Sequence, residues 1–212
     1  MFNKLESCSC FFVTSPIASY KFKTIIAIDV SPAILKEAKK RIRSFSCKNI
    51  ELIIADVRKL PLKSRSTDAI VSLGVLKHIP NQPSSTISAL KEMARVGKAG
   101  CVVYCNDLPN LLHPEAWIYK IAIKIWTKVL KRFTTGTYFY IPSHLTFMLK
   151  RINAKNVIFY GVGWRFSLTS IFVSLPLLSR LFKKSYVNPV FTKESSGKPS
   201  ILFSSYEITF AL

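Results

Sequence analysis

The chain has 212 residues, of which 49% are hydrophobic, and its 31 lysines and arginines against 11 aspartates and glutamates give a net charge of +20. That length and apolar content support one domain with a full core and exclude a disordered chain; only Lys193–Pro199 has a composition that indicates disorder. Five cysteines in a chain of this length do not indicate a secreted disulfide framework, so we expect a reduced, cytoplasmic setting.

The basic surplus predicts a surface that attracts anions, namely nucleic acid, anionic lipid or a phosphorylated substrate. The basic residues are dispersed along the chain, which disfavours a dedicated nucleic-acid patch. Residues 1–20 show no signal peptide, because no continuous apolar core follows a basic start. The longest uncharged stretch, Phe166–Ser179, is shorter than the roughly 20 residues that span a bilayer, so we expect no transmembrane helix.

Runs rich in isoleucine and valine alternate with helix-like segments from residue 24 onward. We expect strands at 24–29, 50–55, 68–73 and 101–105, and helices at 32–43 and 84–96. Ser31 should cap the first helix, with Pro32 in its first turn. This alternation is typical of an α/β fold with a doubly wound, Rossmann-like, mostly parallel sheet and helices on both faces.

Four motifs follow one another along the chain: the strand that ends at Asp29, Leu60-Pro61, the run Asp68–Ile79, and the turn Arg95–Gly100. Over residues 5–107 they resemble the class I S-adenosylmethionine-dependent methyltransferases of the small-molecule "type 11" group. The resemblance implies an antiparallel last strand, S-adenosylmethionine as the cofactor, and methyl transfer to a small acceptor.

The resemblance also implies site residues. Asp29, with Val30, would bind the ribose hydroxyls, since a carboxylate can accept two hydrogen bonds; Asp56, with Val57, would meet the adenine amino group. The backbone of Leu73 and Gly74 would lie against the cofactor. His78 is a candidate general base, because imidazole titrates near neutral pH. The alternatives are a capping or loop carboxylate for Asp29, a turn residue for Asp56 and a helix-terminus histidine for His78.

The first strand and its loop depart from the family pattern. Glu6 stands at the acidic position, but Cys8, Cys10 and Phe12 stand where glycines would permit positive φ and a close approach to the cofactor. The preceding strand is short and no helix comes before it. Three hypotheses stay open: a working methyltransferase, a truncated or degenerate one that keeps the fold as a binding protein, or a basic protein that binds RNA or an anionic membrane.

No metal site is expected. Cys8 and Cys10 belong to the first strand and Cys101 and Cys105 to the fifth, and the fourth strand should separate them by roughly 10 Å. Buried thiols are the better interpretation. The stretch after the fourth strand reads Ser72-Leu-Gly-Val, whereas methyltransferases of exocyclic base amines resemble one another by Asn/Asp-Pro-Pro-Tyr there, so nucleic-acid methylation is disfavoured.

We divide the domain into a cofactor-binding half (1–107), a helical cover (108–155) and C-terminal strands with a helix (156–212). The cover contains an amphipathic helix from residue 117, with a basic stripe of Lys120, Lys124, Lys128 and Lys131 beside a wide apolar arc. This helix either packs on the core or lies on an anionic membrane, which would make the protein peripheral to it. The aromatic residues Trp117, Trp126, Phe133 and Trp164 favour a lipophilic acceptor; oligomeric state is left open.

Four further elements are expected after residue 136. They are a short strand at 137–141, a helix at 144–152 capped by Ser143, a strand at 156–161 and a final antiparallel strand at 201–210. A helix with a bend at Pro176 is expected at 168–184.

Overall fold

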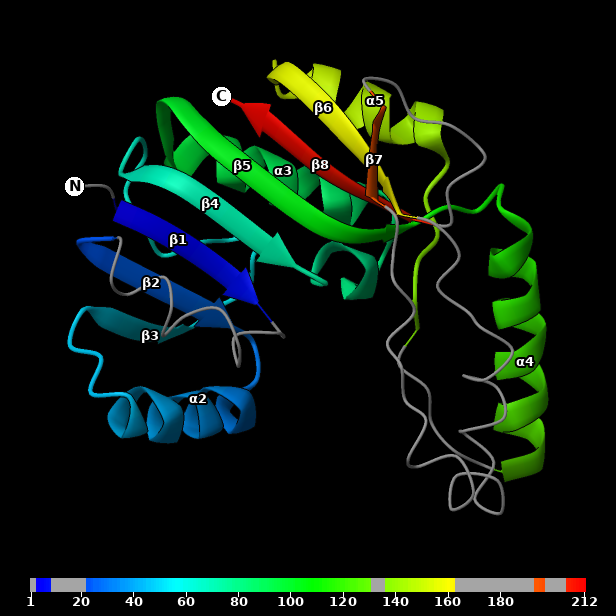
Figure 1. Ribbon diagram of the computed structural model, residues 1–212, viewed down its shortest axis with the longest axis horizontal. Coiled ribbons are helices and arrows are strands. Elements are labelled where there is room, and N and C mark those ends of the chain that lie inside the picture. Colours follow the sequence, from blue (N-terminus) through cyan, green and yellow to red (C-terminus); the bar gives the residue numbers. More distant parts are fainter. Residues whose placement is uncertain (1–2, 9–21, 131–135, 163–192, 197–204) are drawn as a thin grey trace.

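A computed structural model describes residues 3–8, 22–130, 136–162, 193–196 and 205–212. This part of the chain forms one eight-stranded sheet in the order β3-β2-β1-β4-β5-β8-β6-β7 (Figure 1). The strands are β1 (Asn3–Cys8), β2 (Thr24–Asp29), β3 (Ile50–Ile54), β4 (Thr67–Leu73), β5 (Gly97–Pro109), β6 (Lys155–Val162), β7 (Lys193–Ser196) and β8 (Ser205–Ala211). The first five are mutually parallel, and β8 is antiparallel to both β5 and β6.

The helices are α2 (Pro32–Ser44), α3 (Ser84–Val96), α4 (Pro114–Leu130), α5 (Pro142–Arg151) and the short 3₁₀ turn η1 (Leu76–His78). Successive residues of β2 point to opposite faces of the sheet. Ala27 packs with Ala38 of α2, whereas Ile28 belongs to the main core with Leu90 and Met93 of α3. The α/β fold with helices on both faces and an antiparallel last strand is thus confirmed (Figure 1).

The start of α2 shows how local sequence fixes an element. Ser31 is the N-cap, its hydroxyl oxygen accepts the N–H of Ile34 at 3.4 Å, and Pro32 occupies the first turn. Leu35 and Ala38 are buried, as the helical spacing predicted. Asp29, the last residue of β2, therefore stands two residues before the N-cap Ser31.

Three sequence predictions were wrong. β5 runs from Gly97 to Pro109 rather than from Cys101 to Cys105, so residues 97–100 of the expected turn belong to the strand, and a bulge carries Asn106 and Asp107 within it. Residues 137–141 form no strand and make a single bridge, between Asn110 and Tyr140. Helix α5 begins at Pro142 with Ile141 as its N-cap and no side-chain cap, so Ser143 lies inside the helix.

One expectation of disorder was also wrong, because residues 193–196 form the edge strand β7 on β6. The predicted helix at 168–184 and the first part of the strand at 201–210 lie outside the described residues, although β8 covers the remainder of that strand. Among the residues described, no helix is both long and apolar enough to cross a membrane. The three-part division of the domain stays a prediction.

Candidate functional site

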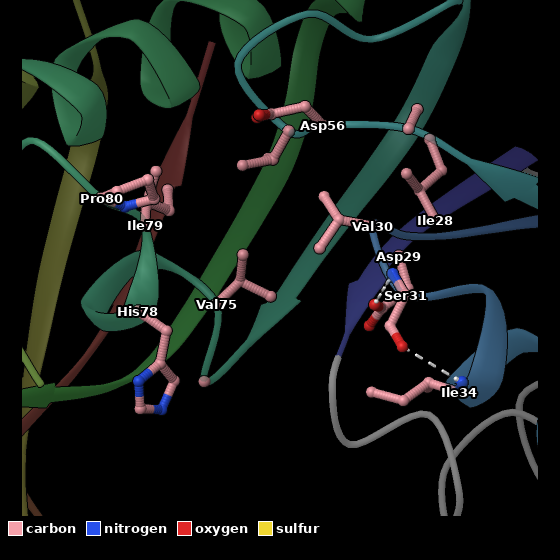
Figure 2. A pocket seen from close by; sticks show the side chains of 13 residues that line it. Ile28, Asp29, Val30, Ser31, Ile34, Asp56, Val75, His78, Ile79 and Pro80 are labelled. Carbon is pink, nitrogen blue, oxygen red and sulfur yellow. Dashed lines mark hydrogen bonds between the residues drawn. The ribbon is translucent and has the colours of Figure 1, made fainter. Parts of the chain in front are cut away.

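A cleft of about 350 Å³ opens where β2, β3 and β4 reach their carboxyl ends. Open parallel sheets bind ligands at this edge. The lining is mostly apolar, with two carboxylates, one serine and one imidazole among it (Figure 2). The lining residues are Ile28, Asp29, Val30, Ser31, Ile34, Ala55, Asp56, Val57, Gly74, Val75, His78, Ile79 and Pro80.

Asp29 is the last residue of β2 and lies half-buried in the cleft. One oxygen of its carboxylate accepts the backbone N–H of Ser31 at 2.8 Å. Burial raises the pKa of Asp29 above its usual range, and hydrogen bonds from the N–H groups of Ser31 and Val30 only partly offset that rise. The remaining acceptor positions of this carboxylate are suited to a ligand with hydroxyl donors.

Asp56 follows β3 and lines the same cleft, but Arg58 holds its carboxylate. The Arg58 Nε lies 3.0 Å from each carboxylate oxygen, and the Arg58 backbone N–H donates to Oδ1 at 2.8 Å. These hydrogen bonds lower the pKa of Asp56. In Figure 2 the Asp56 carboxylate points away from Asp29, so the two acidic groups share the cleft without facing each other.

The turn after β4 forms the opposite wall of the cleft. Gly74 has a φ of 68°, in the left-handed region that favours glycine, and its N–H donates to the Asn106 side chain at 2.8 Å. A salt bridge between Lys77 and Asp107 fastens the same turn to β5. Leu73 itself is buried against Ala27 and does not line the cleft with its side chain.

His78 is exposed at the mouth of the cleft. Its Nδ1 lies 3.3 Å from the carbonyl oxygen of Gly136. A carbonyl can only accept, so this contact places the proton of the neutral ring on Nδ1 and leaves a lone pair on Nε2. Gly136 is held nearby because the N–H of Tyr138 donates to the carbonyl of Lys77 at 2.8 Å.

Of the predicted cofactor-binding residues in the first strand and its loop, the structure describes Glu6 and Cys8. Cys8 ends β1 and pairs in register with Leu73, and Glu6 pairs with Ala27 and Val71, so the carboxyl end of β1 lies between those of β2 and β4. Cys10 lies outside the described residues. Cys101 and Cys105 are buried thiols, and no group of metal-ligating side chains occurs in the part of the chain that the structure describes.

The sequence did not point to Arg58 or Gly136 as parts of the site. It did place Asn106 at the end of the fifth strand, where open α/β sheets bind ligands, but not its hydrogen bond to the Gly74 N–H. Arg58 stands two residues after Asp56, a spacing that favours an ion pair across a turn. That spacing is a local sequence signal from which the contact of Arg58 with Asp56 could have been predicted. Asn106 and Gly136 reach the site only through the bulge in β5 and the pairing of residue 138 with Lys77. Neither contact has a sequence signature.

Residues 8–105 match the family model described as a methyltransferase domain. The demethylmenaquinone methyltransferase of Lactococcus lactis subsp. lactis (strain IL1403) is 32% identical over 105 residues, which are 49% of this chain and 38% of that protein. The chain therefore spans well under two thirds of the length of that curated relative.

Two solved structures show the same fold. An S-adenosylmethionine-dependent methyltransferase of Thermotoga maritima has a TM-score of 0.65 at 15% identity, covering 100% of this chain and 82% of that one. A methyltransferase of the same description from Archaeoglobus fulgidus has a TM-score of 0.63 at 13% identity, covering 100% and 86%. At such identities the likeness concerns the fold alone.

Proposed function

We propose that this chain is a class I S-adenosylmethionine-dependent methyltransferase that transfers a methyl group to a small, apolar acceptor. The match of residues 8–105 to the methyltransferase-domain model, the Lactococcus relative and the shared fold support this proposal. The observation that carries the proposal is one cleft at the carboxyl ends of β2, β3 and β4, lined by Asp29, Asp56 and an apolar wall. A methyl acceptor and a nucleoside cofactor both require such an arrangement of a few polar groups in an apolar cavity.

S-adenosylmethionine is the cofactor of this family, and the described residues fit it at the ribose end. Asp29 has acceptor positions beyond the one that Ser31 uses, which suits a pair of hydroxyl groups. Ile28, Val30 and Val57 offer the adenine ring an apolar surface. The cleft of about 350 Å³ lies at the lower end of the range for small-molecule sites, roughly 300–1,000 Å³.

The adenine end fits less simply, since Arg58 already uses both oxygens of Asp56. In our proposal the adenine amino group shares this carboxylate with Arg58 or displaces one of its hydrogen bonds. The bound cofactor supplies an electrophilic methyl group on a sulfonium. The protein then has to bind it, align the acceptor and keep water out.

For the acceptor we propose an apolar molecule of the quinone type that carries an acidic hydroxyl. The support is the printed name of the Lactococcus relative, a demethylmenaquinone methyltransferase, and the apolar side chains of Val75, Ile79 and Pro80 beside His78. His78 would accept the hydroxyl proton on Nε2, while Gly136 holds the proton on Nδ1.

Isothermal titration with S-adenosylhomocysteine tests the cofactor site. We expect micromolar binding, weakened at least about tenfold in Asp29→Ala, which is what the loss of hydrogen bonds to a charged group produces. Asp68→Ala is the matched control, because Asp68 pairs with Lys98 away from the cleft. If S-adenosylhomocysteine does not bind to the folded wild-type protein, the proposal is contradicted. That result would favour a degenerate methyltransferase that keeps the fold as a binding protein and has lost the cofactor.

A further inference from the structure

The outer surface of α4 combines exposed apolar side chains with lysines. The exposed fractions of Trp117, Ile118 and Ile121 are 57%, 46% and 60%. Lys120, Lys124 and Lys128 of the same helix are exposed as well. We call these six side chains the α4 outer face. Large apolar side chains gathered at one exposed place usually mark an interaction site.

Helical geometry puts the middle of this face opposite to Tyr119, while Lys120 stands at its edge, next to the buried Ala116. At about 100° per residue, Trp117, Ile121, Lys124 and Lys128 fall within one narrow arc. Ala116 is buried, and the ring of Tyr119 packs against Phe139 on the other side of the helix. In Figure 1, α4 lies beyond the end of β5 and does not cover either face of the sheet.

The charges and side-chain types suit an anionic interface. The segment Pro114–Leu130 contains three lysines and a single glutamate, in a chain of net charge +20. The Lys120 ammonium lies 5.4 Å from the ring centroids of Trp117 and of Phe139, a cation–π arrangement in which the charged end of the side chain lies over the rings. Lysine stems and tryptophan rings favour the boundary between water and hydrocarbon, because each has an apolar body and a polar end.

We propose that the α4 outer face docks the protein on a membrane that contains anionic lipids. Trp117, Ile118 and Ile121 would enter the boundary region of the lipid, and the three lysines would stay at the headgroups. Nucleic acid is a poorer occupant, because exposed isoleucines provide nothing that binds phosphate or base edges. The proposal is independent of the cofactor site, since the cleft lining that the structure describes includes no residue of α4.

Co-sedimentation with vesicles tests the docking surface at physiological salt. We expect binding to phosphatidylcholine vesicles that contain phosphatidylglycerol, and little binding to phosphatidylcholine alone. Trp117→Ser with Ile121→Ser should weaken it at least about tenfold, as should the triple variant Lys120→Gln, Lys124→Gln and Lys128→Gln, given about 1 kcal/mol for each lysine near an anionic surface.

Two controls separate this face from general electrostatics. The triple variant Lys36→Gln, Lys39→Gln and Arg43→Gln removes the same charge from exposed positions of α2, and Phe147→Ser removes an exposed aromatic ring from α5. Both should retain wild-type binding to vesicles. Equal losses in the two triple variants, or a wild type that stays in the supernatant, would overturn the proposal. Binding of S-adenosylhomocysteine should be unchanged in every variant, so failure here is distinct from failure at the cleft.

Discussion

At the scale of single residues, we expect Asp29 to affect both the stability of the folded protein and its affinity for the ligand. Its folded pKa is raised by burial, so the ionised carboxylate costs stability, and that cost grows as the pH rises through the raised pKa. Asp29→Asn removes the charge and keeps an oxygen for the N–H of Ser31. We expect urea unfolding at pH 7 to show equal or greater stability, with the difference vanishing in acid.

The same substitution should separate stability from binding. Asparagine cannot accept two hydroxyl donors as a carboxylate does, so affinity for S-adenosylhomocysteine should fall at least about tenfold. In the wild type, affinity should decrease as the pH falls through the raised pKa of Asp29, which titration calorimetry across pH can follow. An affinity that is independent of pH would show that this carboxylate does not contact the ligand.

Arg58 gives the opposite prediction, a gain of binding. Its guanidinium lowers the pKa of Asp56 chiefly through side-chain hydrogen bonds and occupies both carboxylate oxygens. In Arg58→Gln the pKa of Asp56 should return toward its ordinary value, which NMR can measure. Affinity for S-adenosylhomocysteine should increase roughly threefold to tenfold, the value of one hydrogen bond released from competition.

The control for charge alone is Arg43→Gln on α2, where an exposed arginine lies away from the cleft. It should leave affinity unchanged. A weaker affinity in Arg58→Gln would mean that Arg58 itself contacts the ligand, and the adenine end would then have to be assigned to that guanidinium.

At the scale of elements, the turn from β4 into η1 owes its position to Gly74. A side chain at its φ of 68° costs about 1–2 kcal/mol, and Gly100 at 79° carries the same penalty far from the cleft. Gly74→Ala and Gly100→Ala should each lower the free energy of unfolding by about 1 kcal/mol in urea. Only Gly74→Ala should also weaken S-adenosylhomocysteine binding. Equal effects on binding would show that lost stability alone explains both.

The sequence predicted best those elements whose signals are local. The strand 24–29 and the helix 84–96 were predicted with the bounds that the structure has, because their apolar patterns and end signals lie within the segments. The end of β2 was also predicted from local signals, because Ser31 and Pro32 mark the start of the helix α2. This turn places Asp29 in the cleft.

Features that depend on distant partners could not be predicted. Residues 193–196 look disordered by composition, yet they form β7 because β6 offers them an edge. β5 continues to Pro109 because β8 pairs with it past the bulge at Asn106. The contact between His78 and Gly136 likewise depends on a backbone hydrogen bond from Tyr138 to Lys77.

At the scale of the whole molecule, charge is the dominant feature. A net charge of +20 on 212 residues produces repulsion that opposes the compact state and that salt screens. We expect the melting temperature to rise by at least about 3 °C between low and physiological sodium chloride, which for a domain of this size is roughly 1 kcal/mol. Differential scanning calorimetry measures this rise.

Substitutions in α2 test whether repulsion between positive charges causes the rise of the melting temperature with salt. The triple variant Lys36→Gln, Lys39→Gln and Arg43→Gln lowers the net charge by three at exposed positions, so its melting temperature should depend less on salt than that of the wild type. Potassium chloride and sodium chloride should act alike at equal ionic strength, because screening depends on ionic strength and not on the cation. A melting temperature that falls with salt would show that attractive pairs such as Asp56–Arg58 and Lys77–Asp107 outweigh the surplus of positive charge.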